Sequence, residues 1–234
     1  MEIPSQSGKL KDTHIRSYRM LNYEVLDLGL VYYKNAIPNP QEIIDLINDV
    51  DKRFLAGEHG DHPTSVKAWT DWSDGDQLFN WQKFFPKPEE ISTNDYYYAD
   101  QFKISKTLYD SLEVAFNHYA NVLYPFAGRN IKSREHSIHL LRYDEGGYLP
   151  AHSDHGVSSR NLSTVMYLND DYEGGEIEFR QSNVKIKPEA GSIIFFPSNF
   201  LYVHEVYPIT KGSRYSLPHW FHNMRNIISS TGEE

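Results

Sequence analysis

The chain has 234 residues, of which 39% are hydrophobic and 14% aromatic, a composition typical of a folded globular protein. Its formal net charge of −9, with no dense basic stretch, argues against a protein that binds along nucleic acid. The lack of cysteine excludes disulfides and thiolate-bound metal, so a metal site in this chain would need histidine, aspartate or glutamate.

Residues 1–234 are expected to form a single domain, because β-barrels and β-sandwiches of this length are routinely one unit and no repeat or linker interrupts the chain. The first residues lack the apolar segment of a signal peptide, and residues 1–20 are expected to be a flexible arm. No apolar run approaches the roughly 18 residues that suggest a membrane span. With no cysteine besides, we expect a cytoplasmic protein that contacts no membrane.

Residues 21–130 are predicted to contain strands, two helices and an aromatic-rich substrate region. Residues 21–33 are rich in β-prone side chains and are expected to form one or two strands. Apolar residues at helical spacing follow Pro40, which suits the first position of a helix, and Gly57 suits its end. A second helix is predicted over residues 100–123.

Between these helices, residues 58–99 show little periodicity and are rich in aromatic side chains. A long irregular region inside a compact domain is usually functional or mobile. Two interpretations stay open: the aromatic side chains pack as a secondary core, or they form a wall or lid that faces the substrate.

Residues 131–225 change to short strands separated by turns and are predicted to form a jelly-roll core that carries a metal site. About eight strands at this spacing favour an α+β protein built on a double-stranded β-helix, or jelly roll, with the N-terminal helices packed on one sheet. Gly174 and Gly175 are expected to form a tight turn between two of the strands. The predicted strands are residues 136–143, 147–151, 162–168, 175–180, 183–187, 192–196, 201–206 and 214–221.

His152, Asp154 and His204 are the candidate metal ligands. On an extended strand, residues i and i+2 project from the same face, so His152 and Asp154 would converge. Because consecutive strands of a jelly roll alternate between two sheets, the distant His204 can meet them. Two histidines and one carboxylate leave one face of a metal open, as in the facial triad of non-haem Fe(II) oxygenases. His155 is a weaker candidate, since on a strand it would point the other way.

The remaining histidines of this region are expected to be structural. His219 and His222 lie three apart on a predicted strand and would face opposite ways, and the same holds for His136 and His139. Neither pair is therefore spaced to share a metal, although His139 stays a candidate for lining the barrel.

Arg214 and Ser216 would share a face if their segment is a strand. A guanidinium binds a carboxylate through two parallel hydrogen bonds, and a hydroxyl beside it can add a third. We therefore expect a carboxylate-bearing cosubstrate that reaches from the metal to Arg214. Thr164 is expected to touch the same carboxylate if its neighbours Leu162 and Met166 also face inward.

The order of these residues resembles that of the Fe(II)/2-oxoglutarate-dependent dioxygenases, and in particular of their prolyl 4-hydroxylase-like branch. The resemblance covers roughly the C-terminal third to 40% of the chain and is more specific than the HxD motif alone, because several motifs occur in the same order. The similar segments are Arg142-Tyr143 with Gly146-Gly147-Tyr148, Glu173-Gly174-Gly175-Glu176, Pro188-Glu189-Ala190-Gly191-Ser192 with Ile193-Ile194-Phe195-Phe196-Pro197, and His204-Glu205-Val206-Tyr207-Pro208 up to Arg214-Tyr215-Ser216.

This resemblance implies an enzyme that uses Fe(II), 2-oxoglutarate and O2, with ascorbate as an optional reductant. The site it implies has His152, Asp154 and His204 as iron ligands, Arg214 with Ser216 as the clamp on the far carboxylate, Tyr143 with its hydroxyl on the cosubstrate, and Trp220 as a pocket wall.

The resemblance also implies the substrate, which is expected to be a prolyl residue in a peptide or protein. One alternative is hydroxylation of a free amino acid or a small metabolite. An alternative from another class is a non-catalytic jelly-roll binding module with a structural metal, which the complete triad and clamp disfavour. The acidic net charge disfavours a nucleic-acid substrate.

Overall fold

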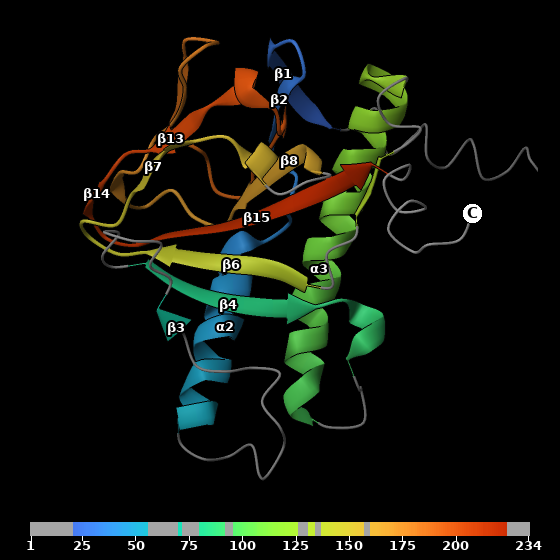
Figure 1. Cartoon of the computed structure of the whole chain (residues 1–234). Helices are drawn as coiled ribbons and strands as arrows, with labels where there is room; N and C mark the ends of the chain where they lie inside the picture. The colour runs from blue at the N-terminus through green and yellow to red at the C-terminus, as the bar shows by residue number, and fades with distance from the viewer. Residues whose placement is uncertain are drawn as a thin grey trace, which may run out of the picture.

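Figure 1 shows the computed structural model of the chain, which describes residues 21–55, 70–71, 80–91, 96–125, 131–133, 137–156 and 160–223. The expected flexible arm, residues 1–20, and much of the aromatic-rich region, residues 58–99, lie outside these described residues.

The described strands form a large sheet, a small sheet and a two-stranded ribbon, with antiparallel pairing throughout. The large sheet has the order β1 (Asn22–Asp27), β2 (Leu30–Lys34), β12 (Ile193–Pro197), β8 (Arg160–Tyr167), β15 (Arg214–Asn223), β6 (Ser137–Tyr143), β4 (Asn80–Pro86) and β3 (Thr70–Asp71), and β5 (Ile131–Ser133) also pairs with β15. The small sheet has the order β11 (Val184–Ile186), β10 (Ile177–Phe179), β13 (His204–Val206) and β7 (Leu149–His152), and the ribbon joins β14 (Ile209–Lys211) to β9 (Glu173–Gly174).

Successive strands of the C-terminal half alternate between the large and the small sheet, which is the connectivity of a jelly roll. β7 of the small sheet lies in sequence between β6 and β8 of the large one, and β13 lies between β12 and β15. The predicted α+β jelly-roll fold is confirmed. Each strand predicted in this half has an observed counterpart, but residues 200–202 form a 3-10 helix, η4, and the strand predicted over 201–206 begins only at His204.

The aromatic-rich region contains a strand that the sequence analysis did not predict. β4 pairs with β6 along its whole length, so this part of the region belongs to the large sheet. Phe85 is 2% exposed in the core, while Phe84 points to the opposite face, edge-on to His139 with the ring centres 4.2 Å apart. The aromatic side chains of β4 therefore lie on both faces of the sheet, Phe85 in the core under the helices and Phe84 on the opposite face.

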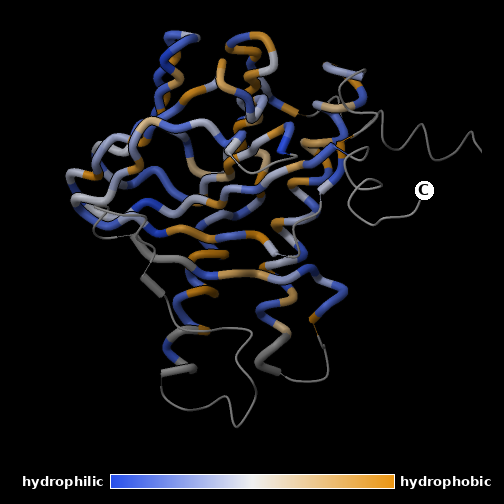
Figure 2. Tube along the Cα trace, in the orientation of Figure 1, coloured by the Kyte–Doolittle hydropathy of each residue, from blue (hydrophilic) through white to orange (hydrophobic). Residues whose placement is uncertain are grey.

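Two helices cover one face of the large sheet (Figure 1). The first, α2 (Pro40–Leu55), begins at the predicted proline, and its hydrophobic and hydrophilic residues alternate in short blocks (Figure 2). The second, α3 (Tyr96–His118), begins earlier than predicted and continues as a π-helical turn, η2 (Tyr119–Leu123). Their apolar faces and the sheet enclose the main core, because a helix stabilises the fold by burying such a face. Among the described residues, no helix combines the length and hydrophobicity needed to cross a membrane.

A smaller core fills part of the space between the two sheets. Tyr167, Ile194 and Phe196 of the large sheet pack against Ile177 and Phe179 of the small one. This contact holds the two sheets together on the face of the large sheet opposite the helices. The rest of the space between the sheets contains the site described below.

His219 lies on the helix-covered face of β15 and is only 1% exposed. Its Nε2 atom lies 2.8 Å from the hydroxyl of Ser133, and the ring of Tyr109 is edge-on to it. Burial, together with nearby positive groups, lowers the pKa of His219 from 6.5 to about 3. The imidazole is therefore neutral in the folded protein, in a structural position away from the inter-sheet space.

We expect His219 to make the protein sensitive to mild acid. Unfolded chains bind a proton at this histidine near pH 6.5, whereas the folded protein does so only near pH 3, so stability present above pH 6.5 is lost as the pH falls. Between pH 7 and pH 5 this loss amounts to about 2 kcal/mol. Urea unfolding at both pH values should show that His219→Gln loses about 2 kcal/mol less than the wild type. An equal loss in both proteins would show that another group causes the acid sensitivity.

Candidate metal centre and carboxylate pocket

Residues from both sheets enclose a cavity of about 470 Å³. The large sheet contributes Tyr143, Arg214 and Ser216, and the small sheet contributes His152 and His204. A larger groove of about 670 Å³ lies between α3 and β5 on the helix side, and none of the predicted ligands line it. The inter-sheet cavity is therefore the one in which the predicted site residues meet.

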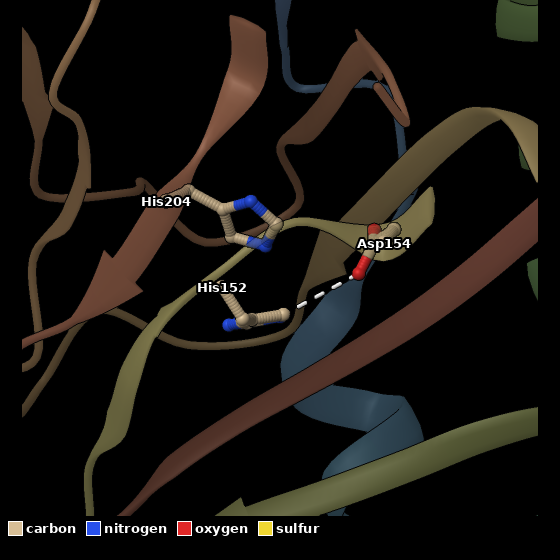
Figure 3. Close-up of side chains that lie close together, drawn as sticks. All are labelled: His152, Asp154 and His204. Carbon is tan, nitrogen blue, oxygen red and sulfur yellow. Dashed lines mark ion pairs between the residues drawn. The ribbon is translucent and has the colours of Figure 1, made fainter. Parts of the chain in front are cut away.

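His152, Asp154 and His204 form a compact cluster at this cavity, as Figure 3 shows. β7 and β13 are neighbours in the small sheet, and His152 and His204 are direct cross-strand partners with ring centres 4.4 Å apart. The Nε2 atom of His152 lies 3.5 Å from Oδ1 of Asp154, and one ligand atom from each of the three residues lies within 4.8 Å of the others. A single divalent metal ion fits such a set, because two imidazoles and a carboxylate need only small shifts to reach bonding distance.

Local backbone contacts orient both imidazoles for metal binding. The Nδ1 atom of His152 is 2.9 Å from the carbonyl oxygen of Pro150, and that of His204 is 3.0 Å from the carbonyl oxygen of Tyr202. Since a carbonyl only accepts, each Nδ1–H donates, and Nε2 is the ring atom left to bind a metal. The Nε2 atom of His152 faces Asp154, so it binds a metal only after losing its proton. Both histidines make this contact with the residue two positions earlier, so the orientation is set locally.

The reason given for the convergence of His152 and Asp154 needs a correction. They were expected to share one face of a strand, but β7 ends at His152, and Asp154 begins a 3-10 turn, η3 (Asp154–Gly156). This turn swings the carboxylate towards the imidazoles. His155, in the same turn, is exposed and lies outside the cluster.

Electrostatics favour the metal-binding forms of Asp154 and His204 at neutral pH. Burial lowers the pKa of His204 to about 4, although the Asp154 charge acts in the opposite direction. Burial alone would raise the pKa of Asp154, but the hydrogen bond from His152 and the two imidazoles hold it well below its usual value. Burial also acts to lower the pKa of His152, and its hydrogen bonds to Asp154 and Pro150 outweigh that effect and raise it. Asp154 is thus ionised and His204 neutral, as a metal requires of its ligands.

Arg214 provides a buried positive charge in the same cavity. The side chain is 1% exposed, and its guanidinium lies 5.1 Å from the ring centres of both Tyr143 and Tyr167. Its Nε and Nη1 atoms have no hydrogen-bond partner, and no acidic side chain of the described residues is paired with it. An unpaired buried charge is costly, so the chemistry of this end of the cavity fits an incoming carboxylate.

The metal cluster and Arg214 lie apart along the large sheet. Asp154 is next to Ser163 of β8, whereas Arg214 is next to Tyr167, four residues further along the same strand. At about 3.3 Å per residue, roughly 13 Å of strand separates the two positions. The long arginine side chain and a short dicarboxylate together can bridge this distance.

Of the other predicted residues, Tyr143, Ser216 and Trp220 line the cavity, and Thr164 does not. Thr164 pairs with His219 and Phe195 of the neighbouring strands, and these three side chains share the helix-covered face of the sheet. The prediction for Thr164 depended on Leu162 and Met166, which do face inward, but towards the helices.

The sequence analysis missed three residues near the cavity, Tyr167, Tyr172 and Arg160, whereas His139, a candidate for lining the barrel, does line the cavity. Tyr167 and Tyr172 approach the Arg214 guanidinium, and neither hydroxyl completes a hydrogen bond. Arg160 lies over the ring of Trp220 at 3.8 Å, and His139 is edge-on to the same ring. Strict alternation would place Arg160 and Tyr167 on opposite faces of β8, but the pairing of β8 with β15 shifts register between Leu162 and Arg160, which the sequence alone does not show.

Part of the chain is similar in sequence to known proteins. The family model of the 2OG-Fe(II) oxygenase superfamily matches residues 138–222, which include the metal cluster and Arg214. Human prolyl 3-hydroxylase 2 is 40% identical over 67 residues, which are 26% of this chain and 10% of the relative. A PKHD-type hydroxylase of Synechococcus sp. (strain CC9902) is 38% identical over 105 residues, or 42% of this chain and 45% of the relative. The chain thus spans less than half the length of these relatives.

Solved structures of prolyl hydroxylases share the fold. A Trichoplax adhaerens prolyl hydroxylase, solved in complex with a peptide fragment of the hypoxia inducible factor oxygen degradation domain, aligns with 98% of this chain and 98% of its own at a TM-score of 0.59 and 16% identity. A Pseudomonas putida prolyl-4-hydroxylase aligns with 83% of this chain and 92% of its own at a TM-score of 0.52 and 20% identity. At these identities the likeness concerns the fold, and the likeness to a family comes from the sequence matches. Residues 138–222 of the chain, which include the metal cluster and Arg214, are therefore similar in sequence to the 2OG-Fe(II) oxygenase superfamily, and the relatives that match there include a prolyl 3-hydroxylase and a PKHD-type hydroxylase.

Proposed function

We propose that this chain is an Fe(II)- and 2-oxoglutarate-dependent hydroxylase that acts on prolyl residues of a peptide or protein. The observation that carries the proposal is the presence, in one cavity, of a two-histidine, one-carboxylate cluster and a buried arginine that pairs with no acidic side chain of the described residues. The superfamily match and the prolyl hydroxylase relatives support it.

His152, Asp154 and His204 are the residues that would hold Fe(II). Their donor set of two imidazole nitrogens and one carboxylate oxygen suits this ion and leaves its remaining positions for other ligands. Fe(II) bound there would supply the activation of O2 that couples oxidation of 2-oxoglutarate to hydroxylation of the substrate. The carbonyl groups of Pro150 and Tyr202 hold the two imidazoles in the ligand-ready tautomer.

Arg214 would bind the far carboxylate of 2-oxoglutarate. Its free Nε and Nη1 donors can form the two parallel hydrogen bonds that a carboxylate accepts, and Ser216, on the same face of β15, lies beside them. Apolar side chains of both sheets, among them Leu149, Val165 and Val206, line the space between and keep water out of it.

A prolyl substrate fits the rest of the cavity. Trp220 and Pro218 offer flat apolar surfaces for a pyrrolidine ring, and Arg160, stacked on Trp220, offers guanidinium donors for carbonyl groups of an extended peptide. The peptide in the Trichoplax adhaerens complex supports a peptide substrate in place of a free amino acid.

2-Oxoglutarate is expected to stabilise the protein only when Arg214 is present. With Mn(II) as a stand-in metal, 2-oxoglutarate at a hundredfold excess over its dissociation constant should add about 2.7 kcal/mol to the unfolding free energy of the wild type. Arg214→Met should abolish this gain and keep the stabilisation by Mn(II), because the metal cluster is untouched. Arg180→Met, which removes an exposed arginine paired with Glu205, is the matched control and should behave as the wild type. A full 2-oxoglutarate response in Arg214→Met would contradict the clamp.

Turnover is expected to require each residue of the metal cluster. With Fe(II), ascorbate, O2 and a proline-rich peptide, the wild type should release succinate, and His152→Ala or His204→Ala should lower that release by at least about a hundredfold, the loss typical of perturbed metal sites. His155→Ala changes an exposed histidine beside the cluster and should retain wild-type turnover. If His152→Ala kept its activity, the assignment of the ligands would be wrong.

The substrate class is tested by comparing a proline-rich peptide with free proline. We expect hydroxyproline, detected by mass spectrometry, in the peptide and little product from free proline, since the stacked Arg160 and Trp220 suit a longer chain. Faster hydroxylation of free proline would overturn the peptide assignment and leave the cofactor assignment intact.

A further inference from the structure

The segment Glu173-Gly174-Gly175-Glu176 packs against Tyr172, which in turn is close to Arg214. β9 and β14 form a separate two-stranded ribbon, and β14 leads directly into β15, which begins at Arg214 (Figure 1). Gly174 and Gly175 have φ angles of 74° and 67°, a conformation that favours glycine. A Cβ atom on Gly174 would lie 2.3 Å from the carbonyl oxygen of Pro208, so the ribbon closes too tightly there for any other residue.

This ribbon encloses the side chain of Tyr172, which is 2% exposed. A Cβ atom on Gly175 would lie 2.9 Å from the Tyr172 ring and 2.4 Å from the Ile209 side chain, so the glycine makes room for both. Lys187 lies 5.0 Å from the ring centre and donates a hydrogen bond to the carbonyl oxygen of Tyr172. The Tyr172 ring is thus enclosed by its neighbours Gly175 and Lys187.

Tyr172 lies behind Arg214 as seen from the cavity. The cavity is lined by Arg214, Tyr143 and Leu141, whereas Tyr172 packs on Tyr143 and Leu141 without lining the cavity itself. Burial raises the pKa of the Tyr172 hydroxyl, and the charge of the nearby Arg214 guanidinium opposes that rise. The Tyr172 side chain therefore occupies the space into which the guanidinium would have to retreat.

We infer that Tyr172 is a specificity-determining residue that sets the length of the dicarboxylate accepted between the metal and Arg214. The inference rests on the proposed function. The tyrosine ring keeps the guanidinium at a fixed distance from the metal ligands. This distance matches 2-oxoglutarate and excludes 2-oxoadipate, which is longer by one methylene. A smaller side chain at this position lets Arg214 move back and accept the longer acid.

The experiment measures binding without turnover. The Mn(II)-loaded protein is titrated with 2-oxoglutarate and 2-oxoadipate, and binding is followed by thermal shift and by the fluorescence of Trp220 and the other tryptophans. For the wild type we expect the ratio of the two dissociation constants to favour 2-oxoglutarate by at least about tenfold, the value of one methylene in a fitted pocket. Tyr172→Leu should bring this ratio close to one.

Three further variants isolate the ring as the cause. Tyr172→Phe keeps the ring and removes only the hydroxyl, so it should keep the wild-type ratio. Tyr207→Leu is the matched control, because its hydroxyl pairs with Glu178 away from the cavity, and its ratio should not change. Tyr172→Met, whose flexible side chain fills irregular space, replaces Tyr172→Leu if that variant does not fold.

Each outcome separates this inference from the proposed function. If the wild type binds neither acid in the presence of Mn(II), the proposed function itself fails. If the wild type binds 2-oxoglutarate but does not discriminate against 2-oxoadipate, or if the Leu and Met variants keep the wild-type ratio, the length control by Tyr172 is overturned and the function stands. A changed ratio in Tyr172→Phe would assign the control to the hydroxyl and overturn the role of the ring.

Discussion

The guanidinium of Arg214 is a positive charge inside the protein with aromatic rings on both sides and no acidic partner among the described residues. A buried charge that lacks its counter-ion destabilises a fold by about 3–5 kcal/mol relative to the paired state. The rings of Tyr143 and Tyr167 recover part of this cost through cation–π attraction. The part of this cost that is left is relieved when a carboxylate ligand binds. The residue that destabilises the free protein is therefore also the one that selects its cosubstrate.

The rest of the fold places this charge at a defined distance from the metal ligands. Arg214 belongs to the large sheet, whereas His152 and His204 are neighbours in the small one. The separation therefore depends on how the two sheets pack, and the contact of Ile194 and Phe196 with Phe179 holds them together. Since packed interiors resist compression, the cavity between the sheets has a nearly fixed length.

The metal ligands depend on contacts that reach further than the cluster itself. His204 is oriented by the carbonyl group of Tyr202, and the Tyr202 hydroxyl donates a hydrogen bond to the carbonyl oxygen of Leu28 in the turn between β1 and β2. The N-terminal hairpin thus supports a ligand from the C-terminal half. His152 is oriented within β7 by Pro150 and approached by the Asp154 carboxylate from the following turn. Each histidine is thus oriented by a contact of its Nδ1 atom, while its Nε2 atom is the one that would bind a metal.

The sequence by itself was enough to determine the fold class, the approximate positions of the eight jelly-roll strands and the four side chains with the most distinctive chemistry, His152, Asp154, His204 and Arg214. Residue type and spacing carry that information, because few other residues can bind Fe(II) or clamp a carboxylate. Only the tertiary structure decided which face of β8 meets the cavity. Both faces of this strand are buried, one under the helices and one between the sheets, so hydrophobic periodicity could not distinguish Thr164 from Tyr167. The position of Tyr172 near Arg214 was also decided by the tertiary structure. It depends on the pairing of β9 with β14, whereas the local sequence indicates only a glycine turn.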